Sequence, residues 1–424
     1  MSSDGSRSPD VVVVGAGPGG VAAAIHLVRA GREVVIVDRA TFPRDKICGD
    51  GLTTASLREL EELGVEPSSI ESWNPVDDVI VRSPSGRTVT FPLPRGAGQY
   101  AAIATRWDLD AALVDRARKE GVVVLEGAAL ETLEDGTDQV AVTTSRGELT
   151  ARYVIAADGM WSPSRKALGL TAPGYLGEWH AFRQYFSHVT GPAAHHLVVS
   201  FEADLLPGYF WAFPLPGGRA NVGFGIERDR KHRVQDMKRL WPDLLARPHL
   251  RELLGPDATP EGTHRAWPIP AQISRVPAGT GRVLFVGDAL SACDPMTGEG
   301  IGQALESGRL AAAAVSACWE RPPAVQERYR ALLRPTLEAD QRMSNLLMRA
   351  LAHRKGVRSS VRLAGSTAWT RRYFVRWLFE DEPRGIAFTP RRWHRRFLSR
   401  PGAYADVQRF GNSEVPKSSL SGSE

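Results

Sequence analysis

The sequence predicts an α/β protein built around an N-terminal βαβ unit, with an inserted antiparallel β-sheet and a helical C-terminal region. Three observations predict this class. A strand–glycine loop–helix–strand pattern occupies Asp10–Asp38, strand-like runs dominate residues 171–268, and the opening strand–loop–helix rhythm returns from Arg282. Because the rhythm returns, we interpret the β-rich part as an insertion into the first domain.

The opening unit begins with Val11–Val14, four consecutive β-branched residues that suit a strand buried on both faces. Gly15, Gly17 and Gly20 follow as G-x-G-x-x-G. In a Rossmann-like unit the first glycine permits a tight turn, the second lets the backbone approach a pyrophosphate, and the third lets the helix pack on the strand. The unpaired N–H groups at the start of that helix would then face the phosphates.

The second half of the unit supports this interpretation. An Ala-rich helix is predicted at Val21–Ala30 with Gly31 as its stop, and an apolar run at Glu33–Val37 ends on Asp38. An acid about 20 residues past the glycines can accept hydrogen bonds from a ribose diol. G-x-G-x-x-G alone is weak evidence, but here the strand, the helix and the acid all agree.

The whole chain has the composition of an ordinary globular protein, with 424 residues, 42% hydrophobic and 24% charged. No apolar run approaches the roughly 18 residues of a membrane span, and Met1–Pro9 is polar rather than a signal peptide, so the cytoplasm is the expected location. Cys48, Cys293 and Cys318 are widely spaced, which favours neither a disulfide framework nor a metal site.

Positive charge is concentrated near the C-terminus. Residues 342–400 hold 15 Lys and Arg against 3 Asp and Glu, whereas the whole chain has a net charge of only +5. Aromatic residues, among them Trp369, Tyr373, Phe374, Trp377, Phe379, Trp393 and Phe397, are interspersed with these arginines. The stretch therefore either lies on an anionic membrane surface or packs on the protein with snorkelling arginines. No nucleic-acid partner is predicted.

Further elements follow from local patterns. Helices are predicted at Thr53–Leu63, Ile103–Arg118, Val234–Leu253, Ile301–Cys318 and Val325–Leu351, and strands at Gly121–Glu126, His180–Val189, His196–Phe201, Tyr209–Pro214, Arg219–Ile226 and Val283–Val286. Hairpins are predicted at Val79–Leu93 and at Val140–Thr144 with Glu148–Ile155.

These elements divide the chain into domains. Residues 1–75, 100–170 and 270–330 are assigned to a discontinuous Rossmann-like nucleotide-binding domain, and residues 76–99 and 171–269 to a β-rich domain. Residues 331–411 form a helical, basic C-terminal region, and 412–424 are expected to be a disordered tail.

Two loops follow strands whose carboxyl ends should face the ligand crevice. In the first, Arg44 and Lys46 are available to phosphates, and Cys48 is either a small buried hydrophobe or a site residue. In the second, Asp288 can bind hydroxyl groups, and a loop shaped by Pro295, Gly298 and Gly300 delivers a helix N-terminus to the crevice. Asp158 is either a site residue or a simple turn residue.

Three separated motifs now stand together: GAGPGG at 15–20, ADG at 157–159, and VGDA with DPMTGEGI at 286–289 and 294–301. The set resembles the FAD-dependent group that contains aromatic hydroxylases, flavin halogenases and geranylgeranyl reductases. The resemblance implies bound FAD. The cofactor-binding residues it implies are Gly15, Gly17, Pro18, Gly20, Asp38, Arg39, Arg44, Cys48, Gly49, Gly51, Arg106, Asp158, Asp288, Pro295, Gly298, Gly300 and Ile301.

Within this group the chain resembles the geranylgeranyl reductase family most. The matching segments are FPRDKICGDGL at 42–52, FRQY at 182–185, GYFWAFP at 208–214 and NVGFG at 221–225. The resemblance implies that the Cys-Gly segment lies against the flavin ring, and that the substrate is a prenyl chain or a related hydrophobic molecule. Substrate-binding residues are then Arg183, Tyr185, Tyr209, Trp211 and Phe213.

The implied reaction is the saturation of an isolated C=C bond by hydride from reduced flavin. Cys48, Tyr209 and Trp211 are the catalytic candidates: Cys48 to supply or relay a proton, and the aromatic residues to form a wall over the flavin. Tyr209, Trp211 and Phe213 alternate on one face of a strand, so they are either this wall or part of the sheet's core. Electrons would come from NAD(P)H or from a ferredoxin-like protein.

Three alternatives stay open. A flavin monooxygenase would use the same fold and cofactor with O₂. A flavin halogenase needs a lysine from the first third of the chain, and no lysine occurs between Ile47 and Arg118. A flavin-binding sensor or scaffold would hold FAD without turning over a substrate.

Overall fold

The computed structural model describes residues 8–228, 234–395, 397 and 399–405. A six-stranded sheet forms the centre of its nucleotide-binding half. The strand order is β18 (Gly279–Thr280), β19 (Val283–Phe285), β12 (Tyr153–Ala156), β1 (Val11–Val14), β2 (Val34–Asp38), β8 (Val123–Glu126). All neighbours are parallel except β18 and β19. The four valines of β1 are buried, as expected for a strand covered on both faces.

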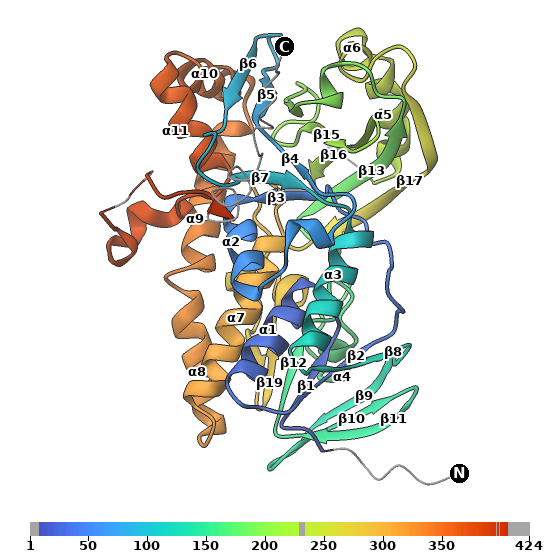
Figure 1. The fold of residues 1–424 in the computed structure, drawn as a ribbon, viewed down its shortest axis with the longest axis vertical. Coiled ribbons are helices and arrows are strands. Elements are labelled where there is room, and N and C mark those ends of the chain that lie inside the picture. The colour runs from blue at the N-terminus through green and yellow to red at the C-terminus, as the bar shows by residue number, and fades with distance from the viewer. Residues whose placement is uncertain (1–7, 229–233, 396, 398, 406–424) are drawn as a thin grey trace, which may run out of the picture.

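Two long helices pack side by side against this sheet, α1 (Pro18–Arg29) and α7 (Ile301–Ala317) (Figure 1). Glycine permits their close approach, because a Cβ atom on Gly308 would lie 2.2 Å from the Gly19 carbonyl oxygen. A Cβ atom on Gly20 would lie 1.9 Å from the Gly15 carbonyl oxygen, so this glycine lets α1 pack on the end of β1. Both α1 and α7 begin at the same end of the sheet, where β1 and β19 also end.

Smaller elements complete this half. They are α2 (Thr54–Leu63), α3 (Arg106–Lys119), α4 (Pro163–Ala167), the sheet β9 (Leu130–Asp135), β10 (Val140–Thr144), β11 (Gly147–Ala151), and the sheet β3 (Gly51–Thr53), β7 (Ala101–Ile103), β4 (Asn74–Pro75). Short 3-10 turns lie at Pro67–Ser69, Ile273–Arg275 and Gly287–Leu290 in this half, and at Pro192–Ala194 in the other half.

Two elements in this half have bounds that differ from those predicted from the sequence. The helix predicted from Ile103 begins at Arg106, because Ile103 belongs to β7 and the Thr105 side chain caps the helix at the Asp108 N–H. The strand predicted at Glu148–Ile155 is two strands, since the chain leaves β11 at Arg152 and enters the six-stranded sheet as β12.

A seven-stranded sheet forms the second half. The order is β17 (Thr259–Ile269), β13 (Trp179–Ser187), β16 (Arg219–Glu227), β15 (Phe210–Leu215), β14 (Leu197–Ser200), β5 (Asp78–Arg82), β6 (Thr88–Pro92). Neighbours are antiparallel except β5 and β14, which bring the early hairpin β5–β6 into the inserted sheet. Strand β17 was not predicted, because it is largely exposed at the sheet edge and contains Pro260, Gly262 and Pro268.

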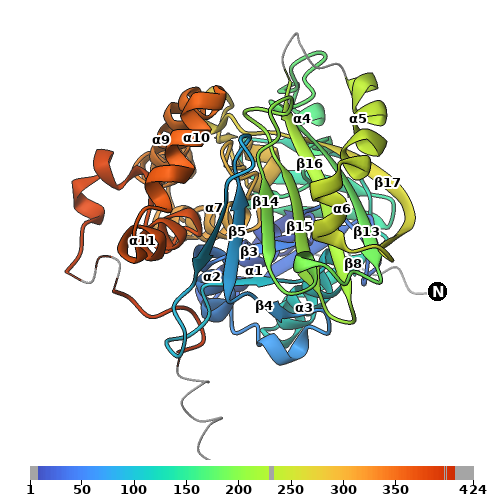
Figure 2. The same ribbon diagram turned by 90° about the horizontal axis from the view of Figure 1, so that it is seen from above.

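The two faces of this sheet have different partners. Helices α5 (Val234–Ala246) and α6 (Pro248–Leu254) cover one face, and Trp241 stacks on Phe224 with ring centroids 6.0 Å apart (Figure 2). Phe210 and Ala212 belong to that core, whereas the alternate residues Trp211 and Phe213 line a cleft between the two halves. The period of two along β15 therefore separates core residues from cleft residues.

The C-terminal helices are α8 (Pro322–Leu333), α9 (Leu337–Leu351), α10 (Arg354–Ala364) and α11 (Ala368–Leu378), followed by 3-10 turns at Arg384–Phe388 and Pro390–Arg392. The single helix predicted at Val325–Leu351 is broken near Pro335. Helix α10 buries Val357 and Val361 in a core shared with β5 and β6. Across the described residues, no helix is long and apolar enough to cross a bilayer. The predicted tail at 412–424 lies outside the described residues.

Candidate active site

A cleft of about 730 Å³ lies between the carboxyl ends of the parallel strands and the seven-stranded sheet. Its walls come from the β1–α1 turn, the end of β2, the loop 44–51, the segment 157–161, the loop 286–301 and strand β15. The volume falls in the range of ligand-binding pockets.

The β1–α1 turn presents an uncapped helix N-terminus to this cleft. Gly15 has a φ of +107°, and a Cβ atom there would lie 2.4 Å from the Ala157 carbonyl oxygen, so a side chain does not fit. Gly17 is the N-cap residue of α1 and makes no side-chain cap, and Pro18 follows at the first helical position. The free N–H groups of this first turn suit an anionic group such as a pyrophosphate.

Two arginines face the same end of the cleft and share one carboxylate. The buried Arg106 guanidinium donates two hydrogen bonds of 2.7 Å to Asp110, and Arg44 Nη1 lies 2.9 Å from Asp110 Oδ2. Asp110 balances one of the two positive charges, so a net positive charge is left toward the cleft. Asp110 was not predicted as a site residue, although it lies one helical turn after Arg106.

Acidic residues stand at the ends of three strands. Asp38 closes β2 and accepts backbone hydrogen bonds from Ala16 at 2.7 Å and Ala40 at 2.8 Å, which hold its carboxylate at the cleft wall beside Arg39. Asp288 forms a 2.9 Å ion pair with Lys46.

Asp158 lines the cleft as well, but both of its carboxylate oxygens are used within the protein. They accept hydrogen bonds from the Ser162 hydroxyl at 2.6 Å and the Ser164 N–H at 2.7 Å. The carboxylate therefore accepts an N–H of the first turn of α4, whose N-cap residue is Ser162.

The Cys48 loop packs against the aromatic strand β15. A Cβ atom on Gly49 would lie 3.6 Å from the Phe213 ring and 3.8 Å from Trp211 Nε1, and one on Gly51 would lie 3.2 Å from Phe213. The two glycines therefore allow the aromatic side chains to approach the loop backbone. Residues predicted from two motifs about 160 positions apart meet here at one wall of the cleft.

Asn221 and Asp50 connect this wall, and neither was predicted as a site residue. Asn221 Nδ2 donates to the Cys48 carbonyl oxygen at 2.9 Å and to Asp50 Oδ2 at 2.7 Å, while Asn221 Oδ1 accepts from Trp211 Nε1 at 3.1 Å. Tyr185 Oη also donates to Asp50, at 2.7 Å. Burial raises the pKa of Asp50 to about 6, although Arg183 and these donors oppose the shift.

Cys48 is partly buried and lines the cleft. Burial, together with the negative charge of Asp50, raises the pKa of the Cys48 thiol to about 11. At neutral pH the sulfur therefore keeps its proton.

Two of the predicted residues lie outside the cleft lining. Gly20 is used in the packing of α1 on β1, and Tyr185 lies behind the wall, where its hydroxyl contacts Asp50 and the Arg183 guanidinium lies 4.1 Å from its ring centroid. The other predicted site residues do line the cleft. Among them, Tyr209 donates a hydrogen bond to the Thr297 carbonyl oxygen and so ties β15 to the loop 294–300.

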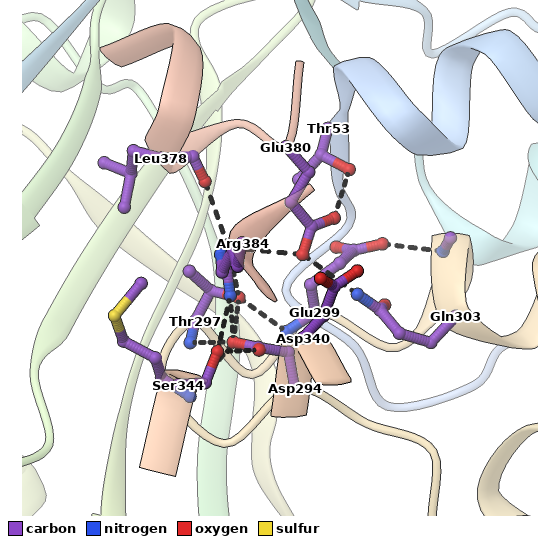
Figure 3. Close-up of polar contacts among 12 residues, drawn as sticks. Thr53, Asp294, Thr297, Glu299, Gln303, Asp340, Ser344, Leu378, Glu380 and Arg384 are labelled. Carbon is purple, nitrogen blue, oxygen red and sulfur yellow. Dashed lines mark hydrogen bonds and ion pairs between the residues drawn. The ribbon is translucent and has the colours of Figure 1, made fainter. Parts of the chain in front are cut away.

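A buried ion-pair cluster supports the loop 294–300 from the C-terminal side (Figure 3). Arg384 pairs with Asp294 and, at 3.2 Å, with Glu380. Asp294 in turn accepts N–H hydrogen bonds from Met296 at 3.0 Å and Thr297 at 2.9 Å, which shape the turn. No sequence motif pointed to Arg384, whereas Glu299 stood within DPMTGEGI and could have been singled out.

Comparison with known proteins assigns this chain to a protein family. Residues 8–329 match the FAD binding domain family. The chain is 35% identical over 339 residues to menaquinone reductase of Mycobacterium tuberculosis, covering 74% of this chain and 77% of that protein. The chain belongs to the FAD-dependent geranylgeranyl reductase family.

A further relative agrees with this assignment, and two solved structures share the fold. Digeranylgeranylglycerophospholipid reductase 2 of Methanopyrus kandleri is 33% identical over 71% of this chain and 75% of its own length. A geranylgeranyl bacteriochlorophyll reductase-like protein of Thermoplasma acidophilum shares the fold, with a TM-score of 0.72 at 21% identity over 92% of this chain and all of that one. The flavin-dependent halogenase CmlS shares it with a TM-score of 0.67 at 20% identity, over 96% of this chain and 77% of that one.

The residues of the cleft fit the cofactor of this family. The uncapped α1 N-terminus and the two arginines suit the pyrophosphate of FAD, and the Asp38 carboxylate at the end of β2 suits a ribose. The protein is therefore an FAD-dependent oxidoreductase with a Rossmann-like domain.

Proposed function

We propose that this protein saturates C=C bonds of a prenyl chain or a related hydrophobic substrate, using bound FAD. The observation that carries the proposal is the contact between the aromatic strand and the Cys48 loop, where Trp211 and Phe213 meet Gly49 and Gly51. The named relatives act on a menaquinone and on a digeranylgeranyl lipid, both of which contain prenyl chains.

Cofactor binding would use the residues assigned above. The pyrophosphate would meet Gly15, Gly17, Arg44 and Arg106, the adenosine ribose would meet Asp38, and the ribityl chain would meet Asp288. When bound and reduced, FAD supplies the hydride for the reaction. Lys46 holds Asp288 in place through its ion pair, so a hydroxyl group there finds an oriented acceptor.

The chain's own side chains would orient and protect the alkene. An unconjugated C=C bond has no carbonyl group to take up the charge that develops, so close positioning and exclusion of water are required. The faces of Trp211 and Phe213 supply a water-excluding surface and can stabilise positive character on the substrate. Asn221 fixes the Trp211 indole through its 3.1 Å hydrogen bond.

Saturation also requires one proton at the second carbon. We assign this proton to the Cys48 thiol, because Cys48 lines the cleft beside the aromatic wall and remains protonated at neutral pH. Tyr209 and Trp211 are assigned as the aromatic partners of the reacting bond. Their supporting observations are their place in the cleft lining and the hydrogen bond that ties Tyr209 to the loop 294–300.

Electrons would enter from NAD(P)H or from a ferredoxin-like protein. Anaerobic addition of NADPH distinguishes these donors, since bleaching of the flavin absorbance is expected only if NADPH reduces the cofactor directly. No bleaching with NADPH, together with bleaching by a reduced ferredoxin, would identify the protein donor.

A lipid substrate suggests contact with a membrane surface, which we propose for the side of α10 and α11 that faces away from the core. Leu363 and Trp369 are 72% and 67% exposed there, and Arg358, Arg362 and Arg372 are also exposed. Exposed apolar side chains beside cations suit an anionic lipid surface.

The reaction is tested by incubating the chemically reduced enzyme with prenylated quinones and lipids without oxygen. Mass spectrometry is expected to detect the gain of one H₂ for each bond saturated. A product that gains oxygen, and forms only in air, would instead identify a monooxygenase. Binding of FAD with no product from any prenyl substrate would favour the sensor interpretation.

A further inference from the structure

Glu299 lies between the cofactor cleft and the buried ion-pair cluster of the C-terminal segment (Figure 3). It immediately precedes Gly300, the N-cap residue of α7, and its side chain is buried. No step proposed above uses this carboxyl group.

The cluster contains more carboxylates than cations. Asp294 and Glu299 are buried and Glu380 is half-buried around one guanidinium, that of the buried Arg384. If every group were ionised, the cluster would carry two uncompensated negative charges away from water. Such a charge costs several kcal/mol, so a buried carboxyl group takes up a proton instead.

One of the three carboxylates, Asp294, is well stabilised as an anion. Asp294 pairs with Arg384 and accepts further hydrogen bonds from Ser344 and Thr297. Glu380 accepts hydrogen bonds from Thr53 and Gln303 at 3.0 Å each and pairs with Arg384 at 3.2 Å. Burial nevertheless raises the pKa of Glu380 to about 7, so this carboxyl group is ionised mainly above neutral pH.

Glu299 has the weakest support of the three. Within the described part of the chain its carboxylate accepts one hydrogen bond, from the Gly302 N–H at 2.8 Å, and no cation pairs with it directly. Burial raises the pKa of Glu299 to about 8, and the negative charge of Glu380 adds to the shift while Arg384 opposes it. The nearby Gln303 Oε1 is a buried acceptor with no partner among the described residues.

Three further ionisable groups near Glu299 are neutral at pH 8. Cys293 lies on the same loop, Cys48 on the loop 42–52, and Tyr209 immediately before β15, and each has its pKa raised by burial. None of these groups compensates an ionised Glu299, so the cleft side of the cluster also favours the protonated form.

We propose that Glu299 is a cofactor-contacting residue that carries a proton at neutral pH, and that FAD binds preferentially to this neutral form. The inference rests on the FAD site proposed above but not on the reaction catalysed there. Binding of FAD would remove water from the cleft beside Glu299 and so raise the cost of ionising it further. By linkage, the affinity for FAD is then retained below about pH 8 and falls as Glu299 loses its proton.

The test measures the dissociation constant of FAD from the apoprotein, by quenching of flavin fluorescence, between pH 6.5 and 9.5. The wild-type affinity is expected to fall above about pH 8, by at most tenfold per pH unit for one proton. Glu299→Gln, which imitates the protonated form, is expected to show no fall in FAD affinity between pH 6.5 and 9.5, whatever its affinity at pH 7. The exposed Glu252→Gln serves as the matched control and should follow wild type.

The Glu380→Gln variant provides a second, independent test of the proposal. Removing the neighbouring negative charge lowers the cost of ionising Glu299, so the fall in affinity is expected to begin at lower pH than in wild type. Infrared spectra of the wild-type apoprotein should also contain the C=O band of a buried carboxylic acid that is lost between pH 7 and 9.5 and is missing from Glu299→Gln, which distinguishes it from the bands of Glu306 and Glu380.

A pH-independent wild-type affinity, a Glu299→Gln protein that loses affinity as wild type does, or the absence of the infrared band would each overturn the proposal. The reaction proposed above is tested separately by product analysis. An enzyme that oxygenates its substrate but shows the expected pH dependence of FAD binding would refute the reductase assignment and retain the role of Glu299.

Discussion

The indole Nε1 of Trp211 donates a 3.1 Å hydrogen bond to Oδ1 of Asn221, which in turn binds the Cys48 carbonyl and Asp50. This contact joins β15, β16 and the Cys48 loop at one wall of the cleft. We expect a double-mutant cycle of Trp211→Phe and Asn221→Ala to give a coupling of about 1 kcal/mol in the free energy of unfolding. Urea unfolding of the four proteins measures it. Additive effects would contradict this role for Asn221.

If Cys48 donates the proton, its substitution should lower the turnover rate without loss of bound FAD. Cys48→Ala is expected to lower turnover of the prenyl substrate by about 10²-fold, the usual size of an acid–base contribution. The flavin absorbance spectrum of the variant should remain that of the wild type. Cys318→Ala is the control, because Cys318 is buried in the core at the end of α7. Unchanged turnover of Cys48→Ala would contradict the assignment of Cys48 as the proton donor.

Asp50 predicts a pH-dependent stability. Its pKa in the folded protein is raised from 3.8 to about 6, so its contribution to stability is fully present below pH 4 and is lost as the pH rises through 6. The loss between pH 4 and 7 is on the order of 3 kcal/mol, by the conversion of a two-unit shift.

Asp50→Asn should remove this contribution. The difference in unfolding free energy between wild type and Asp50→Asn is expected to change with pH between 4 and 7, and the exposed Asp115→Asn should show no such change. Urea unfolding at pH 4.5 and 7 provides the measurement. A constant difference for Asp50→Asn would show that Asp50 is ionised at both pH values.

Substitution of Arg106 is expected to lower both the stability of the protein and its affinity for FAD. Arg106→Gln leaves Asp110 buried with only Arg44 nearby, and breaking one side of a buried pair costs about 3–5 kcal/mol. We expect weaker FAD binding and a lower melting temperature, both restored in part by Arg106→Lys, which keeps the charge. Calorimetry of the apoprotein separates the two effects. A stable Arg106→Gln protein with wild-type FAD affinity would contradict the geometry.

The membrane-contacting side proposed for α10 and α11 predicts salt-sensitive binding to vesicles. Wild type is expected to sediment with anionic phospholipid vesicles at low salt and to be released as salt is raised. Trp369→Ser with Leu363→Ser should weaken this binding, whereas Trp107→Ser, a similarly exposed residue on α3, should leave it unchanged. Equal binding of all three proteins, or none at any salt, would exclude this face.

Local sequence patterns predicted the strands β1 and β2 and the helix between them, because their buried valines, glycines and helix formers lie within about 30 residues. Strand β17 was missed since its prolines, glycine and exposed polar residues hide the alternation. Among the site residues, the glycines, arginines and aromatic side chains of the motifs were predicted, and Asn221 and Asp50 were not. They meet across 171 positions, and no local pattern encodes such a pairing.

The amino-acid sequence alone determined a dinucleotide crevice, an inserted sheet and an aromatic strand, because these features depend on glycine spacing and on periodicity along short segments. Only the tertiary structure decided which side of β15 faces the cleft and which acids share the guanidinium of Arg384. It also decided that Glu299 pairs with no cation among the residues that the structure describes. The physical reason is that burial and Coulomb interaction act through space, over contacts between residues as far apart as Asp294 and Arg384.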